Sequence, residues 1–192
     1  MSKRNYWVLS DPHLHHTNIL HYARPEFDSV QQMNECIYDH WNETVKPGDK
    51  VYVLGDLYMK VKAEVVGAEL KKLPGRKQLI VGNHDDILEI SRLGIFYEIR
   101  MWKQWKEQGV LLTHVPVHEF SRKEKLDLLN IHGHTHLNGS PEGRYISACV
   151  EYTDYRPVTI EELKERYERD GHSKSKADSS GSTAVIEESR AS

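Results

Sequence analysis

Polar blocks that carry metal-ligating side chains follow short apolar runs at five places in this chain. The blocks are Asp11-Pro12-His13, Gly55-Asp56, Gly82-Asn83-His84-Asp85, His114 and Gly133-His134-Thr135-His136. The apolar runs ahead of them are rich in residues that favour strands, and they cover residues 6–9, 51–54, 78–81, 110–113 and 129–132. Loops beyond the carboxyl ends of parallel strands face a common crevice, so we expect the blocks to converge. This order constrains the chain to a sheet fold whose strand ends surround one site.

Helical patterns occur between these runs. The first pattern carries Ser29 and Gln32 at its start, placed as a capping box, and the last carries Thr159 and Glu162 in the same arrangement. Residues 97–104 and 110–113 flank a turn and predict a hairpin. The predicted helices cover residues 29–45, 64–73 and 122–128, with a last helix that starts at Thr159 and ends near Asp170.

Length and composition indicate one globular domain. The chain has 192 residues and a mass of 22.3 kDa, which is enough for a single core without disulfides. We expect the domain to cover residues 1–170. Residues 171–192 are rich in Ser, Lys, Gly and Ala, and such a composition predicts a disordered tail. The oligomeric state is left open.

Charge and cysteine content exclude several classes of protein. The formal net charge of −3 does not favour strong nonspecific nucleic-acid binding. The apolar run that begins at Tyr6 is too short for a signal peptide or a membrane span. Cys36 and Cys149 lie far apart and have no partner at metal-ligand spacing, so we expect no disulfide scaffold and a cytoplasmic location.

Carboxylate, imidazole and amide ligands together suit a pair of divalent transition metal ions. Two ions roughly 3.5 to 4 Å apart need a bridging carboxylate, and Asp56 is our choice for it. Such a pair generates a bridging hydroxide that attacks phosphorus, and His84 is placed to supply a proton to the leaving oxygen. Manganese is the metal we favour, with zinc, iron and nickel as alternatives.

The five blocks in this order resemble the calcineurin-like metallophosphoesterase superfamily, over residues 8 to 136. The resemblance implies a four-layer αββα sandwich of two mixed β-sheets flanked by helices, in the α+β or α/β class. It implies His84 as the proton donor. It also implies a first ion held by Asp11, His13, Asp56 and His136, and a second ion held by Asp56, Asn83, His114 and His134.

One departure from the family's protein phosphatases bears on the substrate. Their second block continues into an arginine that clamps the phosphate of a monoester, whereas Leu57-Tyr58-Met59-Lys60 follows Asp56 here. We therefore favour a phosphodiesterase that acts on nucleotide-type or cyclic diesters, with a small phosphoester as its partner. Lys60 or Arg122 is an alternative clamp. A phosphomonoesterase and a non-catalytic scaffold of the same fold are the other hypotheses.

Several further residues keep two interpretations. Asp85 orients His84 or a bound water in one, and caps a turn in the other. Trp102 and Trp105 either stack on nucleobases or, in the simpler interpretation, cover one face of a hairpin. Four more histidines are either solvent-exposed or close to the metals and substrate: His15, His16, His118 and His132.

Overall fold

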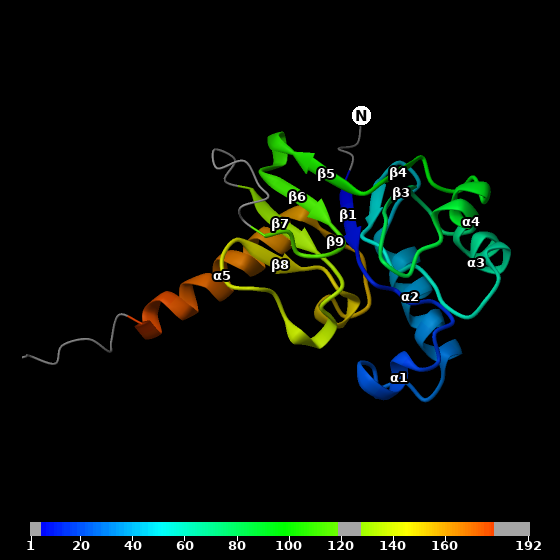
Figure 1. Ribbon diagram of the computed structural model, residues 1–192, viewed down its shortest axis with the longest axis horizontal. Coiled ribbons are helices and arrows are strands. Elements are labelled where there is room, and N and C mark those ends of the chain that lie inside the picture. Colours follow the sequence, from blue (N-terminus) through cyan, green and yellow to red (C-terminus); the bar gives the residue numbers. More distant parts are fainter. Residues whose placement is uncertain (1–4, 119–127, 179–192) are drawn as a thin grey trace, which may run out of the picture.

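The computed structural model describes residues 5–118 and 128–178, which form two sheets with helices around them (Figure 1). None of the helices in these ranges is both long and apolar enough to cross a membrane. The strands are β1 (Tyr6–Leu9), β2 (Lys50–Val53), β3 (Arg76–Ile80), β4 (Glu98–Arg100), β5 (Trp102–Trp105), β6 (Val110–Thr113), β7 (Leu129–His132), β8 (Tyr145–Ser147) and β9 (Val158–Thr159). The α-helices are α1 (Ile19–Tyr22), α2 (Val30–Thr44), α3 (Ala63–Leu70), α4 (Ile87–Arg92) and α5 (Ile160–Asp178), and short 3₁₀ helices cover Lys106–Gln108, His136–Asn138 and Val150–Tyr152.

Both sheets contain parallel and antiparallel pairs. The first sheet has the order β4-β3-β2-β1-β9, with β1 to β4 parallel and β9 antiparallel to β1. The second has the order β5-β6-β7-β8, with β5 antiparallel to β6 and the other pairs parallel. The parallel strands in each sheet therefore end at one edge, where the loops that follow them carry the polar blocks.

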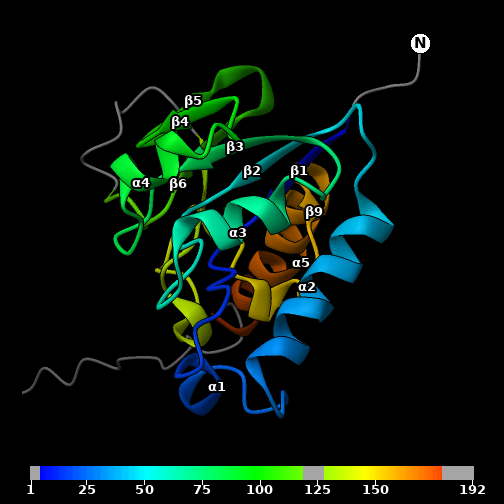
Figure 2. The ribbon, with the colours of Figure 1, turned by 90° about the vertical axis from the view of Figure 1, so that its right-hand side faces the viewer.

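The first sheet is buried on both faces, which explains why its strands are continuous apolar runs. Leu9 of β1 and Leu79 of β3 pack among the residues of α2 and α3. Their neighbours Val8 and Ile80 point the other way and pack against the second sheet. Figures 1 and 2 show α2 and α3 on the side of the first sheet opposite to the second sheet.

The predicted fold class is confirmed: the chain is an α+β sandwich of two mixed sheets flanked by helices. The last helix contacts β8 of the second sheet and β1 and β9 of the first. Its first residues, Ile160 and Leu163, are buried in the cluster between the sheets.

The predicted capping box at Thr159 is complete, whereas at Ser29 the Gln32 side chain bonds the N–H of the preceding residue, Asp28, in place of the Ser29 N–H. The Ser29 hydroxyl accepts from the Gln32 N–H at 3.2 Å, and the Gln32 side chain accepts from the Asp28 N–H at 2.8 Å. At the start of α5, Thr159 Oγ1 accepts from the Glu162 N–H at 3.1 Å, and Glu162 Oε2 accepts from the Thr159 N–H at 2.7 Å. These bonds satisfy N–H groups that a helix start leaves without partners.

Two expected elements differ from the structure, and others lie outside the described residues. The predicted hairpin is confirmed in part, because β5 pairs with β6 in antiparallel fashion. The expected strand over residues 97–104 is divided, however, since the chain leaves the first sheet after β4, passes the exposed Met101, and enters the second sheet as β5. The last helix continues beyond Asp170 to Asp178. The helix expected over residues 122–128 falls outside the described residues, except for Leu128, and so does the part of the expected tail from residue 179 on.

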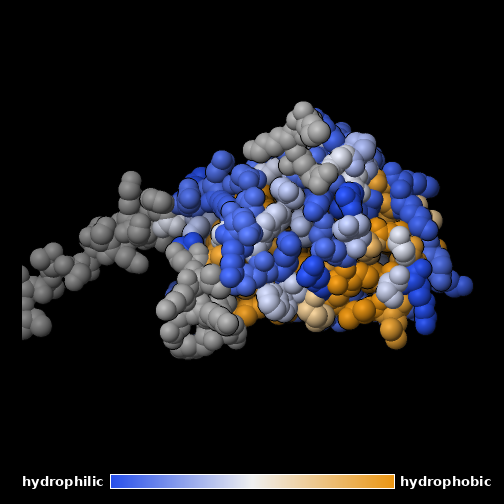
Figure 3. Space-filling view, turned by 90° about the horizontal axis from the view of Figure 1, so that it is seen from above, coloured by the Kyte–Doolittle hydropathy of each residue, from blue (hydrophilic) through white to orange (hydrophobic). Residues whose placement is uncertain are grey.

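Apolar side chains are exposed on one side of the molecule. Figure 3 shows them gathered on the side where Figure 1 places α3 and α4. Val65 of α3 and Ile87 and Leu88 of α4 are between 42% and 68% exposed. Both helices thus expose apolar residues on the side away from the first sheet.

Asp49 connects the turn before β2 to the start of β1. Its carboxylate accepts from the N–H groups of Asn5 and Lys46, both at 3.1 Å, and from Trp7 Nε1 at 2.9 Å. Burial raises the pKa of Asp49, but the hydrogen bonds from Trp7 and the two backbone N–H groups outweigh burial and lower the pKa overall.

We expect Asp49→Asn to lower the free energy of unfolding by about 1–3 kcal/mol at neutral pH, because an amide presents one acceptor oxygen instead of two. The folded pKa lies below the unfolded value of about 3.9, so the charged carboxylate stabilises the fold above that value. This contribution is lost as the pH falls through the folded pKa. Urea unfolding of both proteins between neutral pH and about pH 3 measures it. A difference that grows towards acid would contradict the assignment.

Candidate metal centre

Five of the predicted ligands lie in strained backbone. Asp11, His13, Asp56, His134 and His136 have φ angles between 43° and 68°. This left-handed region is uncommon for residues other than glycine, and only nine non-glycine residues of the described chain occupy it. Such strain persists where the surrounding structure holds it, and it is concentrated at functional sites. The sharp turns after the strands aim these side chains at one another.

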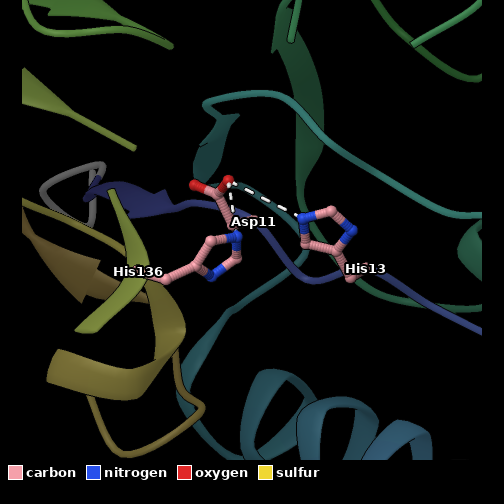
Figure 4. A group of neighbouring side chains, drawn as sticks. All are labelled: Asp11, His13 and His136. Atoms are coloured by element: carbon pink, nitrogen blue, oxygen red, sulfur yellow. Dashed lines mark ion pairs between the residues drawn. The ribbon is translucent and has the colours of Figure 1, made fainter. Parts of the chain in front are cut away.

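The first ligand group consists of Asp11, His13 and His136, whose ligand atoms lie within 4.8 Å of one another. Asp11 Oδ1 lies 3.9 Å from Nε2 of each histidine, and Figure 4 shows both rings directed at this carboxylate. Asp11 Oδ1 and both ring nitrogens of His13 are buried without a hydrogen-bond partner in the described chain. An unsatisfied buried polar atom costs about 1–3 kcal/mol, so a cation among these atoms is a good fit.

Asp11 is held by its other oxygen. Oδ2 accepts from the Ser10 hydroxyl at 2.5 Å, from the His134 N–H at 2.9 Å and from the Cys149 thiol at 3.4 Å. These donors occupy Oδ2 and leave Oδ1 facing the two rings. Burial raises the pKa of Asp11, and the charges of His114 and His136 and the Ser10 hydrogen bond oppose this rise.

The second ligand group consists of Asp56, His114 and His134, again with ligand atoms within 4.8 Å of one another. His114 Nδ1 lies 2.8 Å from the Leu54 carbonyl oxygen, which only accepts, so Nδ1 carries the proton. In the neutral ring Nε2 therefore presents its lone pair to Asn83 Oδ1, also at 2.8 Å. A cation between these two atoms would bind to both, and so this pair of acceptors suits a metal site.

Asp56 lies between the two groups. Its Oδ2 is 3.5 Å from His13 Nε2 of the first group, and its Oδ1 is 3.5 Å from His114 Nε2 of the second. The His84 N–H donates to Oδ1 at 2.9 Å and fixes the carboxylate in this position. One oxygen thus faces each group, which is the arrangement expected of a bridging ligand.

Asp85 caps the turns around Asp56. Its carboxylate accepts from the N–H groups of Gly82 at 2.8 Å, Leu57 at 2.8 Å and Asp56 at 3.1 Å. Burial raises the pKa of Asp85, and the backbone hydrogen bonds oppose the rise. Of the two interpretations left open for this residue, the structure supports turn capping.

His84 stands apart from both groups. Its side chain is 45% exposed, and its Nε2 lies 4.0 Å from Asp56 Oδ2. Its ring centroid lies 5.8 Å from that of His13. The residue therefore borders the two groups and reaches solvent.

The protonation state of His13 suits metal binding. Burial lowers its pKa to about 2, with further contributions from the charges of Arg24 and His136. The ring is therefore neutral at ordinary pH and offers a lone pair. Carboxylates, neutral imidazoles and one amide are ligands of divalent transition metals, so the donor set fits the expected pair.

The other histidines occupy different surroundings. His16 is buried beside the site, with its ring centroid 5.3 Å from that of His13. His15 Nε2 lies 2.9 Å from Glu69, and His132 lies between the Gly133 carbonyl oxygen and the Ser140 hydroxyl. The fourth, His118, is exposed. Of these histidines, His16 is the one that borders the ligand groups.

Two residues of the site were missed by the sequence analysis. Arg24 is fully buried and contacts Glu151, which in turn contacts His136. Neither residue belongs to a polar block after a strand, and a single Arg or Glu in a sequence gives no signal of burial. Only the folded structure, which brings Arg24, Glu151 and His136 into contact, reveals that they are connected.

Gly133 and Gly82 allow the close approach on which both groups depend. A Cβ atom at Gly133 would collide with Ser10 Oγ and Asp11 Oδ2. A Cβ atom at Gly82 would collide with Asp56 Oδ1. Each glycine thus makes room for a carboxylate of a different ligand group.

Comparison with known proteins places the chain in a family without a named activity. No protein-family model matches it. The uncharacterized protein MJ1445 of Methanocaldococcus jannaschii is 32% identical over 169 residues, which cover 84% of this chain and 90% of that protein. The chain therefore belongs to the same family as MJ1445.

Two further proteins are similar to this chain. The Gene 66 protein of Mycobacterium phage D29 is 27% identical over 165 residues, covering 69% of this chain and 78% of the phage protein. The crystal structure of AQ665 from Aquifex aeolicus, a protein of unknown function, superposes with a TM-score of 0.66 at 29% identity. That match covers 85% of this chain and 99% of AQ665.

We expect Gly133→Ala to lower metal content and to cost about 1–3 kcal/mol of stability, because the added Cβ displaces Ser10 or the Asp11 carboxylate. Gly48→Ala is the matched control, since a Cβ there meets nothing within 4 Å. Elemental analysis after manganese loading and thermal unfolding compare both variants with the unmodified protein. Full metal content in Gly133→Ala would show that the Asp11 position is not critical.

Proposed function

We propose that this protein is a dinuclear metal-dependent phosphoesterase of the calcineurin-like type, most simply a phosphodiesterase acting on nucleotide-type or cyclic diesters. The observation that carries the proposal is the position of Asp56, with one oxygen towards each ligand group. The resemblance of the five sequence blocks supports the same conclusion. Manganese is the metal we favour, and the proposed compartment is the cytoplasm.

The residues of the two groups would hold the metal ions and set the net charge of the site. When bound, two divalent ions supply positive charge that activates water and stabilises the phosphoryl oxygens. Asp11 and Asp56 contribute the negative charge of the site, and the histidines and Asn83 ligate without adding more. The site thus retains a positive excess for an anionic substrate.

His84 is proposed to give a proton to the leaving oxygen. It borders Asp56 without belonging to either group, and its side chain reaches solvent. A histidine can act as a general acid: its imidazolium would donate a proton as the bond to the leaving group breaks and recover the proton from water.

The preference for diesters rests on where the cations lie. Arg24 is occupied by backbone carbonyl groups and Glu151, and it is fully buried, so it cannot clamp a substrate phosphate. Arg122, an alternative clamp, lies outside the described residues. A dianionic monoester loses more than a monoanionic diester when a bidentate guanidinium is absent.

Lys60 is the remaining alternative clamp. It is exposed. Burial is the largest cause of the lowered pKa of His16, and the charge of Lys60 lowers this pKa further. It also lines an open hollow of about 820 Å³, with Lys62 and Glu89 among the other lining residues. None of the residues that line this hollow is a predicted metal ligand, so the proposal draws on Lys60 alone and not on the hollow.

The scaffold hypothesis is less well supported. A binding module of this fold needs no intact ligands, whereas all seven predicted ligands are present and converge in two groups with Asn83 beside the second. A phosphomonoesterase remains the second catalytic candidate, because Lys60 carries a positive charge near the site.

We expect the manganese-loaded protein to hydrolyse bis-p-nitrophenyl phosphate with a higher kcat/KM than p-nitrophenyl phosphate, by about tenfold or more. A missing charge-assisted contact is worth about 1.5–3 kcal/mol, which sets this ratio. Steady-state assays with both substrates measure it, with chelator-treated protein as the control. Faster monoester turnover would favour the phosphomonoesterase, and metal binding without turnover of either substrate would favour the scaffold.

We expect His84→Ala to keep both ions and to lose about 10²–10⁴-fold in turnover of diesters with poor leaving groups. With p-nitrophenol, which leaves without a proton, the loss should be much smaller. Asp56→Asn should instead lose metal, because it removes the charge between the two groups. His40→Ala, on α2, is the control. Elemental analysis and assays with both leaving groups measure these effects, and a metal-free His84→Ala would contradict its role as proton donor.

A further inference from the structure

We propose that Glu151 and Arg24 are positioning residues that fix His136 and the Asp11 loop for the first metal ion. This inference rests on the proposed function, since it assumes that the first ligand group binds a cation. Neither residue lies in the five sequence blocks, and neither is expected to touch metal or substrate. Their contacts nevertheless reach Asp11 and His136 directly, and the Pro12 carbonyl group that precedes His13.

Glu151 sets the orientation of the His136 ring. Its Oε1 lies 2.9 Å from His136 Nδ1. A carboxylate only accepts, so this nitrogen carries the hydrogen, and in the neutral ring the lone pair is left on Nε2. Nε2 is the atom that faces Asp11 Oδ1 at 3.9 Å. Glu151 therefore selects the tautomer that can bind a metal, a task that carboxylates often perform for metal-bound histidines.

Arg24 keeps Glu151 charged and in place. Its Nε and Nη2 atoms lie 3.0 and 2.9 Å from Glu151 Oε1. The Arg24 side chain is 0% exposed and that of Glu151 is 2% exposed, so neither charge is solvated by water. Burying either one alone costs several kcal/mol, and each therefore requires the other.

The same guanidinium also holds the first sequence block. Arg24 Nη2 donates to the Asp11 carbonyl oxygen at 2.5 Å, and Nη1 donates to the Pro12 carbonyl oxygen at 2.8 Å. These carbonyls lie where Asp11 and His13 adopt left-handed backbone conformations, with φ angles of 55° and 46°. Donors on both carbonyls stabilise this otherwise unfavourable turn.

One buried ion pair therefore links two parts of the first group that are far apart in sequence. Arg24 holds the loop of Asp11 and His13 after β1, and Glu151 holds His136 after β7. The described contacts of this pair include none to the second group of Asp56, His114 and His134. Its loss should thus weaken one metal site selectively.

The test replaces the acceptor and measures metal binding and tautomer separately. In Glu151→Leu, manganese titration of metal-free protein should show one site weakened by about 10- to 100-fold and the other unchanged. Nitrogen NMR of metal-free protein, at about two pH units above the ordinary histidine pKa of 6.5, reports which ring nitrogen of His136 carries hydrogen. We expect Nδ1–H in the unmodified protein and a mixture in Glu151→Leu.

Two variants separate positioning from mere packing. Glu151→Gln keeps an acceptor oxygen, so it should retain Nδ1–H and bind metal more tightly than Glu151→Leu. Glu69→Leu is the matched control, because Glu69 also accepts from a histidine, His15 at 2.9 Å, but outside both ligand groups. It should leave both metal affinities unchanged. If Glu151→Leu does not fold, the double variant Arg24→Met/Glu151→Leu, which removes both buried charges, takes the place of Glu151→Leu in these measurements.

Two results would overturn the proposal. One is an unmodified His136 with its hydrogen on Nε2, and the other is a folded Glu151→Leu or double variant that binds both ions with unchanged affinity. A different result would contradict the proposed function alone. A protein that hydrolyses no phosphoester, yet shows a Glu151-dependent Nδ1–H on His136 and one selectively weakened metal site, would retain the positioning pair and lose only the reaction.

Discussion

The Asp11 carboxylate ties the two sheets together where both deliver their ligands, and the arrangement of the site depends on this contact. Asp11 follows β1 of the first sheet, and its Oδ2 accepts from the backbone N–H of His134, which follows β7 of the second. The Ser10 hydroxyl and the Cys149 thiol hold the same oxygen. Because one oxygen is fully used in joining the sheets, the other is left in a fixed direction. Each ligand group takes residues from both sheets, so a shift between the sheets would separate the ligands within each group.

The cost of building the site explains why metal binding and folding should be coupled. Left-handed turns at ligand residues and buried atoms without partners, such as Asp11 Oδ1 and His13 Nε2, work against the folded state. A cation that binds these atoms compensates for both. Ligands that bind only the folded state stabilise it by about 2.7 kcal/mol at a hundredfold excess over Kd. The free energy gained by burying the large core of the sandwich offsets the cost of this strain, and metal binding would recover part of that cost.

The sequence predicted those features that depend on local pattern or on strand order. The apolar runs around Leu9 and Leu79 are strands because both faces of the first sheet are buried, and the helix caps at Ser29 and Thr159 need only neighbouring residues. The predicted ligands could be identified because each follows such a run, and the structure brings them together in two groups. The exit of the chain at Met101 from one sheet into the other was not predicted, since a strand pattern does not specify its partner.

Long-range polar contacts were beyond the reach of the sequence for a different reason. Arg24 and Glu151 are charged residues, which sequence patterns assign to the surface, and their burial depends on mutual neutralisation across 127 positions. The capping role of Asp85 was open for a similar reason, because its three N–H partners come from two separate loops. Such residues become visible only when the fold brings their partners together.

The two ligand groups differ in their access to solvent, and this difference orients the proposed reaction. Two members of each group are buried, but the third member of the first group, His136, is 18% exposed, whereas the third member of the second, His134, is exposed. Asn83 and His84, which lie beside the second group, are exposed as well. A substrate phosphate would therefore approach from the side of the second group, with its leaving oxygen towards His84. The first group lies beside the buried Arg24–Glu151 ion pair, and its most exposed side chain, His136, is only 18% exposed. This group would act mainly as a fixed source of charge. In the proposed reaction, unequal access would thus give two similar sets of side chains different tasks.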